Sequence, residues 1–206
     1  ILKMKYERLW NQLIFSKFMN SYINRLKDCF SDNLIDSIYE LNNELKDAWI
    51  NKRNIYLCGN GGSGANANHI ANDLLYGVGF NRANGNYKIG MRVESLVSNP
   101  GVLTCLANDI NYENVFAKQI EIKGDTNDLL IALSGSGNSP NIIKALEVAN
   151  FKGLKTFAIV GFDGGKCKKI ANKNIHCSIN DMEISEDIQM IIFNTCKQWL
   201  INNPPN

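Results

Sequence analysis

The sequence predicts an α/β protein with a five-stranded parallel sheet between two layers of helices, preceded by two further helices. From about residue 54 onwards, short apolar runs alternate with helical segments, which is the βαβ rhythm of a parallel sheet. Two of the apolar runs lead directly into segments rich in glycine and serine. The 206 residues, 45% of them hydrophobic and 20% charged, suffice for one sizeable domain.

The first 50 residues predict two helices that serve oligomerisation and pack on the same domain. Over residues 5–29 apolar residues recur at helical spacing, but their stripe over residues 9–26 is too wide for a simple surface helix. Such a helix needs cover on more than one side. The second helix is expected to start at Ser31 or Asp32, either of which can cap it, and to end near residue 50.

The main domain is expected to span residues 51–202. Its strands are predicted at residues 54–58, 91–97, 128–133, 156–161 and 174–178, and its helices at 63–75, 101–107, 114–122, 140–151, 165–171 and 184–201. Residues 77–88 form one long polar loop, a candidate lid or subunit contact. Residues 203–206 are expected to be a frayed tail.

Composition excludes several classes of partner. The formal charge of +2 combines 22 basic and 20 acidic residues without a long basic cluster, so nucleic acid is not expected as a direct ligand. No stretch of about 18 apolar residues could span a bilayer, and no signal segment is present. The six cysteines are scattered without a C-x-x-C pair and are interpreted as reduced thiols. These observations favour a cytoplasmic protein without a membrane partner.

The segment Ser134–Ser139 has the features of a phosphate cradle. It follows the apolar run at 128–133 and precedes a helix that starts at Pro140. Glycines let the backbone N–H groups approach an anion, the serine hydroxyls add donors, and the helix presents the positive end of its dipole. Because the loop has no lysine, a sugar phosphate fits better than ATP with magnesium. The alternative is a flexible Ser/Gly turn.

A second glycine-rich segment, Gly59–Gly64, follows the strand at 54–58 and matches the pattern G-x-G-x-x-G. A dinucleotide site would also need an acidic residue about 20 residues further on. Glu94 lies about 30 residues past Gly64 and is a poor candidate. The two loops are instead expected to meet at neighbouring strand ends and to grip one sugar phosphate.

A set of motifs over about residues 54–200 has the order and spacing of a known protein family. They are Cys58–Ser63, His69, Ala107–Asp109, Val115–Phe116, Ser134–Pro140, Asp163–Lys166 and Ile188–Gln189. With them the chain resembles the sugar isomerase (SIS) domain family, in the phosphoheptose isomerase branch. That branch includes sedoheptulose 7-phosphate isomerases and a non-catalytic protein that binds the bacterial replication initiator. The resemblance implies a flavodoxin-like sheet and a homotetramer built on the N-terminal helices.

The resemblance also implies the residues that hold a phosphorylated sugar. The phosphate would be bound by Ser63, Ser134, Gly135, Ser136 and Ser139. The sugar pocket would be lined by Asn60, Gly61, Asp109 and Glu186.

The chain departs from the family at the catalytic positions. Isomerisation needs a base that removes the proton next to the carbonyl and an acid that moves a proton between two oxygens. The enzymes of this branch use a glutamate four residues after the histidine and a second histidine eight residues after the glutamine. Here Asp73 stands four residues after His69, and Lys197 stands eight residues after Gln189. The candidate catalytic residues are Asp73, Lys197, His69 and Gln189, with Asp73 as base and Lys197 or His69 as acid or oxyanion partner.

Both changes alter what the site can do. Asp73 keeps the carboxylate but retracts it by roughly 1.5 Å, and a shift near 1 Å can cost about 100-fold in rate unless the backbone compensates. Lys197 cannot act as a neutral imidazole, but its ammonium group can stabilise an enediolate. The sequence assigns no cofactor, and the resemblance leaves zinc possible. Zinc, which the family can bind, would have His69, Asp73 and Gln189 as ligands and is disfavoured without the second imidazole.

Structural roles stay open for the same residues. Asp73 can be a simple i, i+4 partner of His69, and Lys197 near the end of the last helix suits the helix dipole. The leading hypothesis is a phosphosugar aldose–ketose isomerase of the phosphoheptose type, acting through an enediolate and with an altered substrate as one option. The alternative is a non-catalytic phosphosugar-binding or regulatory SIS protein. A nicotinamide-dependent oxidoreductase ranks third.

Overall fold

The computed structural model describes residues 2–81 and 83–205 and confirms the predicted α/β fold. The five parallel strands are β1 (Asn54–Gly59), β2 (Arg92–Ser95), β3 (Leu129–Ser134), β4 (Lys155–Val160) and β5 (Lys173–His176). The α-helices are α1 (Leu2–Asp28), α2 (Asp32–Ile50), α3 (Gly61–Leu75), α4 (Pro100–Asp109), α5 (Ala117–Lys123), α6 (Pro140–Phe151), α7 (Cys167–Ile170) and α8 (Met182–Asn202). None of the described helices is both long and apolar enough to cross a bilayer.

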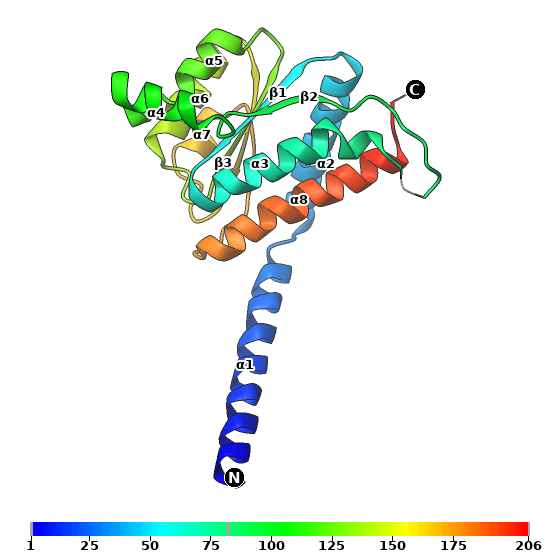
Figure 1. The fold of residues 1–206 in the computed structure, drawn as a ribbon, viewed down its shortest axis with the longest axis vertical. Coiled ribbons are helices and arrows are strands. Elements are labelled where there is room, and N and C mark those ends of the chain that lie inside the picture. The colour runs from blue at the N-terminus through cyan, green and yellow to red at the C-terminus, as the bar shows by residue number, and fades with distance from the viewer. Residues whose placement is uncertain (1, 82, 206) are drawn as a thin grey trace.

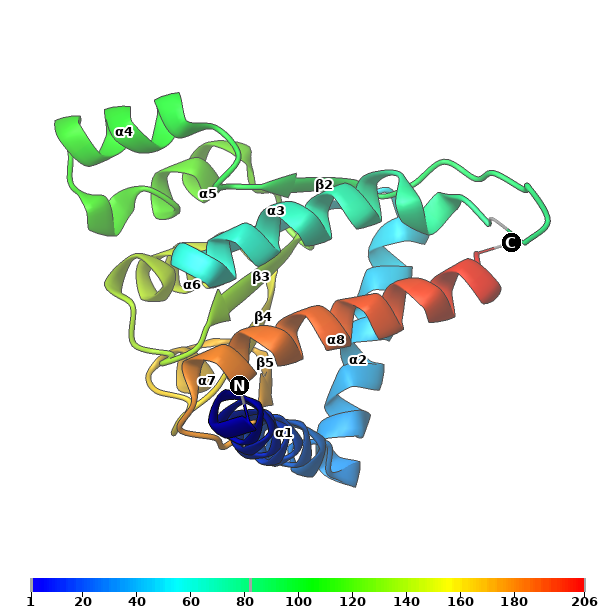
Figure 2. The same ribbon diagram turned by 60° about the horizontal axis from the view of Figure 1, so that its bottom comes forward.

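Helices cover both faces of the sheet (Figure 2). A hydrophobic cluster on each face holds the three layers together. Alternate residues of one strand serve opposite faces, so Leu57 of β1 packs with α2, α3 and α8, whereas Tyr56 packs with α5 and α6. Strands buried on both faces read as continuous apolar runs, which is why the sequence marks them clearly. β2 and β5 are the edge strands of the sheet, and β2 pairs with β1 over Arg92–Ser95 rather than over the predicted residues 91–97.

The strand order β2–β1–β3–β4–β5 places the ends of β1 and β3 side by side. In this register Gly59 at the end of β1 stands opposite Leu133, one residue before the end of β3. Strand order reverses between these two strands, and ligands of open parallel sheets bind at such a point. The two glycine-rich loops therefore leave the sheet next to each other, as the sequence predicts.

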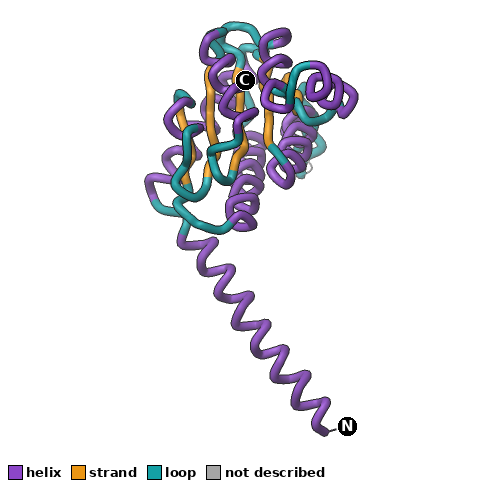
Figure 3. Tube along the Cα trace, turned by 90° about the vertical axis from the view of Figure 1, so that its left-hand side faces the viewer, coloured by secondary structure: helices purple, strands orange, loops and turns teal. Residues whose placement is uncertain are grey.

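The two N-terminal helices differ in how they meet the domain. α2 buries Leu34, Leu41 and Leu45 against the sheet and α8. α1 has 27 residues, so it is about 40 Å long, and it projects away from the domain (Figures 1 and 3). Among its described side chains, those that meet the domain come from its last turns, where the Tyr22 hydroxyl donates to Asp187 (2.7 Å). The earlier part of its apolar stripe, including Trp10, Phe15 and Phe18, is exposed within one chain.

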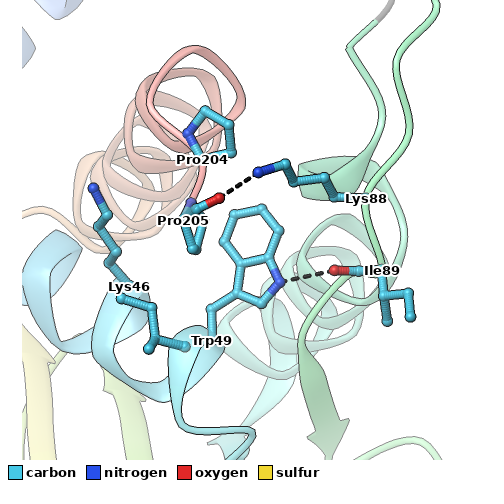
Figure 4. A pocket seen from close by; sticks show the side chains of 7 residues that line it. Lys46, Trp49, Lys88, Ile89, Pro204 and Pro205 are labelled. Carbon is cyan, nitrogen blue, oxygen red and sulfur yellow. Dashed lines mark hydrogen bonds between the residues drawn. The ribbon is translucent and has the colours of Figure 1, made fainter.

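The long loop and the C-terminal segment both pack against the domain. The first part of the loop is a short 3₁₀ turn, Gly77–Gly79, in which Val78 is buried; residues 82 and 206 lie outside the described residues. Pro204 and Pro205 are half-buried beside Trp49 and Lys88 in a pocket of about 450 Å³ (Figure 4). The Trp49 indole N–H donates to the Ile89 carbonyl (2.8 Å), which fixes the far end of the loop on α2.

Candidate functional site

The two glycine-rich loops form one small pocket of about 110 Å³ at the carboxyl ends of β1 and β3. Its lining residues are Asn60, Ser63, Leu133, Ser134, Gly135, Ser136, Ser139, Met182 and Glu186. The structure thus brings together every residue predicted to hold the phosphate, together with two of those predicted to line the sugar pocket.

Glycine is needed at two positions where these loops make close backbone contacts, one within the first loop and one between the serine loop and the segment after β4. A Cβ atom on Gly59 would lie 2.6 Å from the backbone of Ser63, so the strand end and the first turn of α3 could not approach as they do. Gly137 has φ of +65°, and a Cβ there would lie 2.1 Å from the Gly164 carbonyl oxygen. These contacts fix the backbone of both loops beside the pocket.

Two helix N-termini point toward this pocket. Ser139 stands at the N-cap position of α6 and Asn60 at that of α3, but neither side chain hydrogen-bonds to the first turn of its own helix. The Asn60 amide instead exchanges two hydrogen bonds with Asn141 (2.9 and 2.8 Å) and accepts one from the Tyr112 hydroxyl (3.0 Å). Backbone N–H groups and the positive ends of two helix dipoles suit a bound anion.

Helices α3 and α8 lie side by side and run in the same direction from this pocket (Figures 1 and 2). Near their N-terminal ends the Gln189 amide donates to Ser63 Oγ (3.0 Å). Near their C-terminal ends Lys197 Nζ donates to Asp73 Oδ1 (2.6 Å). Asp73 comes ten positions after Ser63, so the two residues lie about 15 Å apart along the helix. The anion pocket and the Asp73–Lys197 pair therefore form opposite ends of one helical seam.

The Asp73–Lys197 pair lines a wider, more open pocket of about 440 Å³. Both side chains are half-buried, whereas His69 is 59% exposed and places Nε2 3.5 Å from Asp73 Oδ2. A Cβ on Gly77 would lie only 2.9 Å from Lys197 Nζ, so this glycine leaves room for the ammonium group. The carboxylate is thus held between an ammonium group and an imidazole.

Three of the predicted site residues have other surroundings. Gln189 is buried and uses both amide atoms between the helices, since its Oε1 accepts from Asn66 (3.0 Å). Asp109 is exposed at the end of α4, where hydrogen bonds from Asn108 and then Cys105 hold the pKa of its carboxyl below the ordinary value. Gly61 opens α3 with φ of +53°. For these residues a direct contact with sugar stays a prediction.

Sequence reasoning missed Tyr112, Asn141 and Met182. Tyr112 and Asn141 hold Asn60 in place, and Met182 covers Gly135, where a Cβ would lie 2.4 Å from the Met182 sulfur. Asn141 had a usable signal, because it stands directly after Pro140 in the first turn of a helix that follows the serine loop. Tyr112 and Met182 come from distant segments and carry no local signal.

Zinc does not suit the Asp73 end of the seam. His69 and Asp73 offer one nitrogen and one carboxylate, but Lys197 already occupies Asp73 Oδ1, and both atoms of the Gln189 amide are engaged elsewhere. Within residues 2–81 and 83–205, no group of three or more His, Cys, Asp or Glu side chains is arranged to hold a metal ion. This donor set lacks the four ligands typical of zinc.

Comparisons with known proteins agree with this architecture. The SIS domain family matches residues 17–161. A phosphoheptose isomerase of Helicobacter pylori (strain HPAG1) is 38% identical over 145 residues, which cover 69% of this chain and 71% of the relative. One of Sulfurimonas denitrificans is 39% identical over 142 residues, with 69% and 70% covered. The solved phosphoheptose isomerase of Neisseria gonorrhoeae has a TM-score of 0.81 at 22% identity and covers 93% of this chain and 98% of that one.

Proposed function

The chain belongs to the SIS domain family, and from that premise we propose that it is an aldose–ketose isomerase of phosphosugars. One observation carries the proposal: an anion pocket and a carboxylate–ammonium pair lie at opposite ends of the α3–α8 seam. Relatives at 38% and 39% identity are named phosphoheptose isomerase, which supports the same reaction.

The length of the seam favours a long, open-chain sugar. Ser63 and Asp73 lie about 15 Å apart along α3. An extended chain advances about 1.2 Å per bond, so seven carbons and a terminal phosphate ester span about 10 Å. The side chains of Ser63 and Asp73 can bridge the remainder from either end. A four-carbon sugar phosphate would fall several ångströms short, so a six- or seven-carbon substrate fits best.

In the proposed reaction the phosphate stays in the serine pocket while the carbonyl end reaches Asp73. The Asp73 carboxylate takes the proton from the carbon next to the carbonyl, and the C–H electron pair forms the enediolate double bond. Negative charge then develops on the former carbonyl oxygen, which the Lys197 ammonium group stabilises. Asp73 returns its proton to the neighbouring carbon, and His69 moves a proton between the two oxygens.

A non-catalytic phosphosugar-binding protein is the second candidate, favoured by the Asp73–Lys197 contact itself. At 2.6 Å the two side chains neutralise each other. Such a closed pair can serve to join α3 to α8 without taking part in any reaction. This candidate predicts tight phosphosugar binding with no proton exchange.

Isotope exchange separates the two candidates. The full chain is incubated with sedoheptulose 7-phosphate, and separately with fructose 6-phosphate, in deuterated water, and deuterium at the carbon next to the carbonyl is followed by NMR. We expect exchange with the wild-type protein. Binding without exchange would favour the second candidate. If the protein shows no binding and no exchange with these sugars, both candidate functions are contradicted.

We also propose a homo-oligomer, with a tetramer as the expected form, held by α1. In the single chain Trp10, Phe15 and Phe18 are 64%, 68% and 65% exposed. A large exposed apolar patch of this kind marks a surface that binds another protein. Light scattering should give a mass above 23.1 kDa, and the double change F15E/F18E should lower it.

The free thiols of all six cysteines agree with a reducing cytosol.

A further inference from the structure

A carboxylate already lies on the first turn of α3, inside the proposed phosphate pocket. The Ser63 backbone N–H donates to Glu186 Oε1 (3.1 Å). A Cβ atom on Gly62 would lie 2.1 Å from Glu186 Oε2, so the carboxylate rests directly over this glycine. Glu186 therefore caps α3 from the neighbouring helix, in the place where the Asn60 side chain makes no capping bond.

The Glu186 carboxylate is stabilised by backbone groups rather than by a cation. It lines the 110 Å³ pocket with Ser134, Ser136 and Ser139. In the described part of the chain no lysine, arginine or histidine forms an ion pair with it. The N–H group of Ser63 and the dipole of α3 are thus what holds the negative charge. These are the same groups that a bound phosphate would use.

A phosphate dianion and this carboxylate repel each other strongly at contact distance in a half-buried pocket. The side chain of Glu186 can move, but its backbone cannot easily do so. The residue lies between the buried Ile184 and Ile188 on α8, and the Ser185 hydroxyl binds the Asp181 carbonyl (2.7 Å). A ligand must therefore displace the carboxylate from the Ser63 N–H group.

We infer that Glu186 determines specificity by keeping small anions out of the pocket and yielding to phosphorylated polyols. Inorganic phosphate meets the charge repulsion and offers little in return. A sugar phosphate also brings hydroxyl donors, and the displaced carboxylate can accept hydrogen bonds from them. The net cost of displacement is then lower for the sugar phosphate. This inference rests on the proposed function, because it takes the ligand to be a phosphorylated sugar.

The test compares two ligands on three full-length proteins by calorimetry. Glu186→Gln keeps the shape and removes the charge, and Glu183→Gln makes the same change one turn away at an exposed position outside the pocket. We expect Glu186→Gln to lower the Kd for inorganic phosphate at least about tenfold. Its Kd for sedoheptulose 7-phosphate should stay equal or rise. Glu183→Gln should leave both values unchanged.

A gain of affinity is a readout that a merely structural role of Glu186 would not produce. A second variant, Glu186→Ala, empties the position if glutamine keeps the bond to Ser63. The inference is overturned if neither Glu186 variant, shown to be folded by circular dichroism, binds inorganic phosphate more tightly than the wild-type protein. Failure of the wild-type protein to bind any sugar phosphate would instead contradict the proposed function.

Discussion

The two ends of the α3–α8 seam are built in different ways. The phosphate end consists of backbone N–H groups, close glycine contacts and short hydroxyl side chains at the ends of two strands. The Asp73 end consists of side chains from two helices that meet in a wider and more open pocket. The first end is fixed when the chain folds, whereas the second depends on the identity of a few residues.

This difference would allow the phosphate end of such a site to stay the same while its catalytic end changes. Replacing a residue of the serine loop disturbs backbone positions that several segments share. The resemblance implies a glutamate and a histidine where this chain has Asp73 and Lys197, and this pair joins α3 to α8 at 2.6 Å. Binding and chemistry are therefore separable, and variants at each end should affect different measurements.

The largest expected effect is on the rate, from Asp73→Asn. Removing the base should lower deuterium exchange about 1,000-fold, within the range typical of general bases. The affinity for sugar phosphate should stay within a few-fold, since the phosphate pocket is about 15 Å away along the helix. Isotope exchange and calorimetry measure the two quantities. Asp36→Asn, an exposed change on α2, is the control. A parallel loss of affinity would show that the two ends are not separable.

Lys197→Met should also act on the rate, by about 100-fold, because the enediolate loses a charged donor. It should cost about 1–2 kcal/mol of folding free energy as well, since Asp73 then lacks its ammonium partner. Urea unfolding gives the second value. Lys118→Met breaks an ion pair of the same length, 2.6 Å, on the exposed surface and should change neither quantity appreciably. An unchanged exchange rate in Lys197→Met would assign this lysine a structural role alone.

The phosphate end should respond in affinity, and Gly137→Ala tests it. The positive φ and the contact with the Gly164 carbonyl predict a loss of about 2–3 kcal/mol in folding free energy. Displacement of the loop should weaken sugar phosphate binding, by about 30-fold for roughly 2 kcal/mol. Gly101→Ala, in the first turn of α4, has space for its Cβ apart from a 3.2 Å approach to Asn99 Oδ1 and serves as control. Full affinity in Gly137→Ala would rule out a rigid cradle.

The same difference decides what the sequence could reveal. The sheet, its switch point and the phosphate loops are local signals: apolar runs followed by glycine and serine. Glycines interrupt the helical pattern at the start of α3, so the sequence predicts a start at residue 63, whereas the helix begins at Gly61. The position of Glu186 over Gly62 could not be predicted, because it depends on how α3 and α8 are aligned, and the residues in contact are 123 apart in sequence. The projection of α1 was equally hidden, since its stripe shows the need for cover but not the direction of the helix.

The smallest expected effect separates binding from folding within the phosphate end. Ser139→Ala should hardly change the folding free energy, because the Ser139 side chain makes no cap bond to α6, where a lost cap typically costs about 1 kcal/mol. Its hydroxyl lines the phosphate pocket, so sugar phosphate affinity should fall about tenfold, as for one hydrogen bond to a charged group.

Ser31→Ala is the control, with the opposite expected effects on stability and affinity. Ser31 caps α2 by accepting from the Leu34 N–H (3.4 Å) and lies outside the phosphate pocket, so this change should lower stability by about 1 kcal/mol and leave affinity unchanged. If Ser139→Ala destabilises the protein as much as Ser31→Ala does, its hydroxyl serves the helix rather than the ligand.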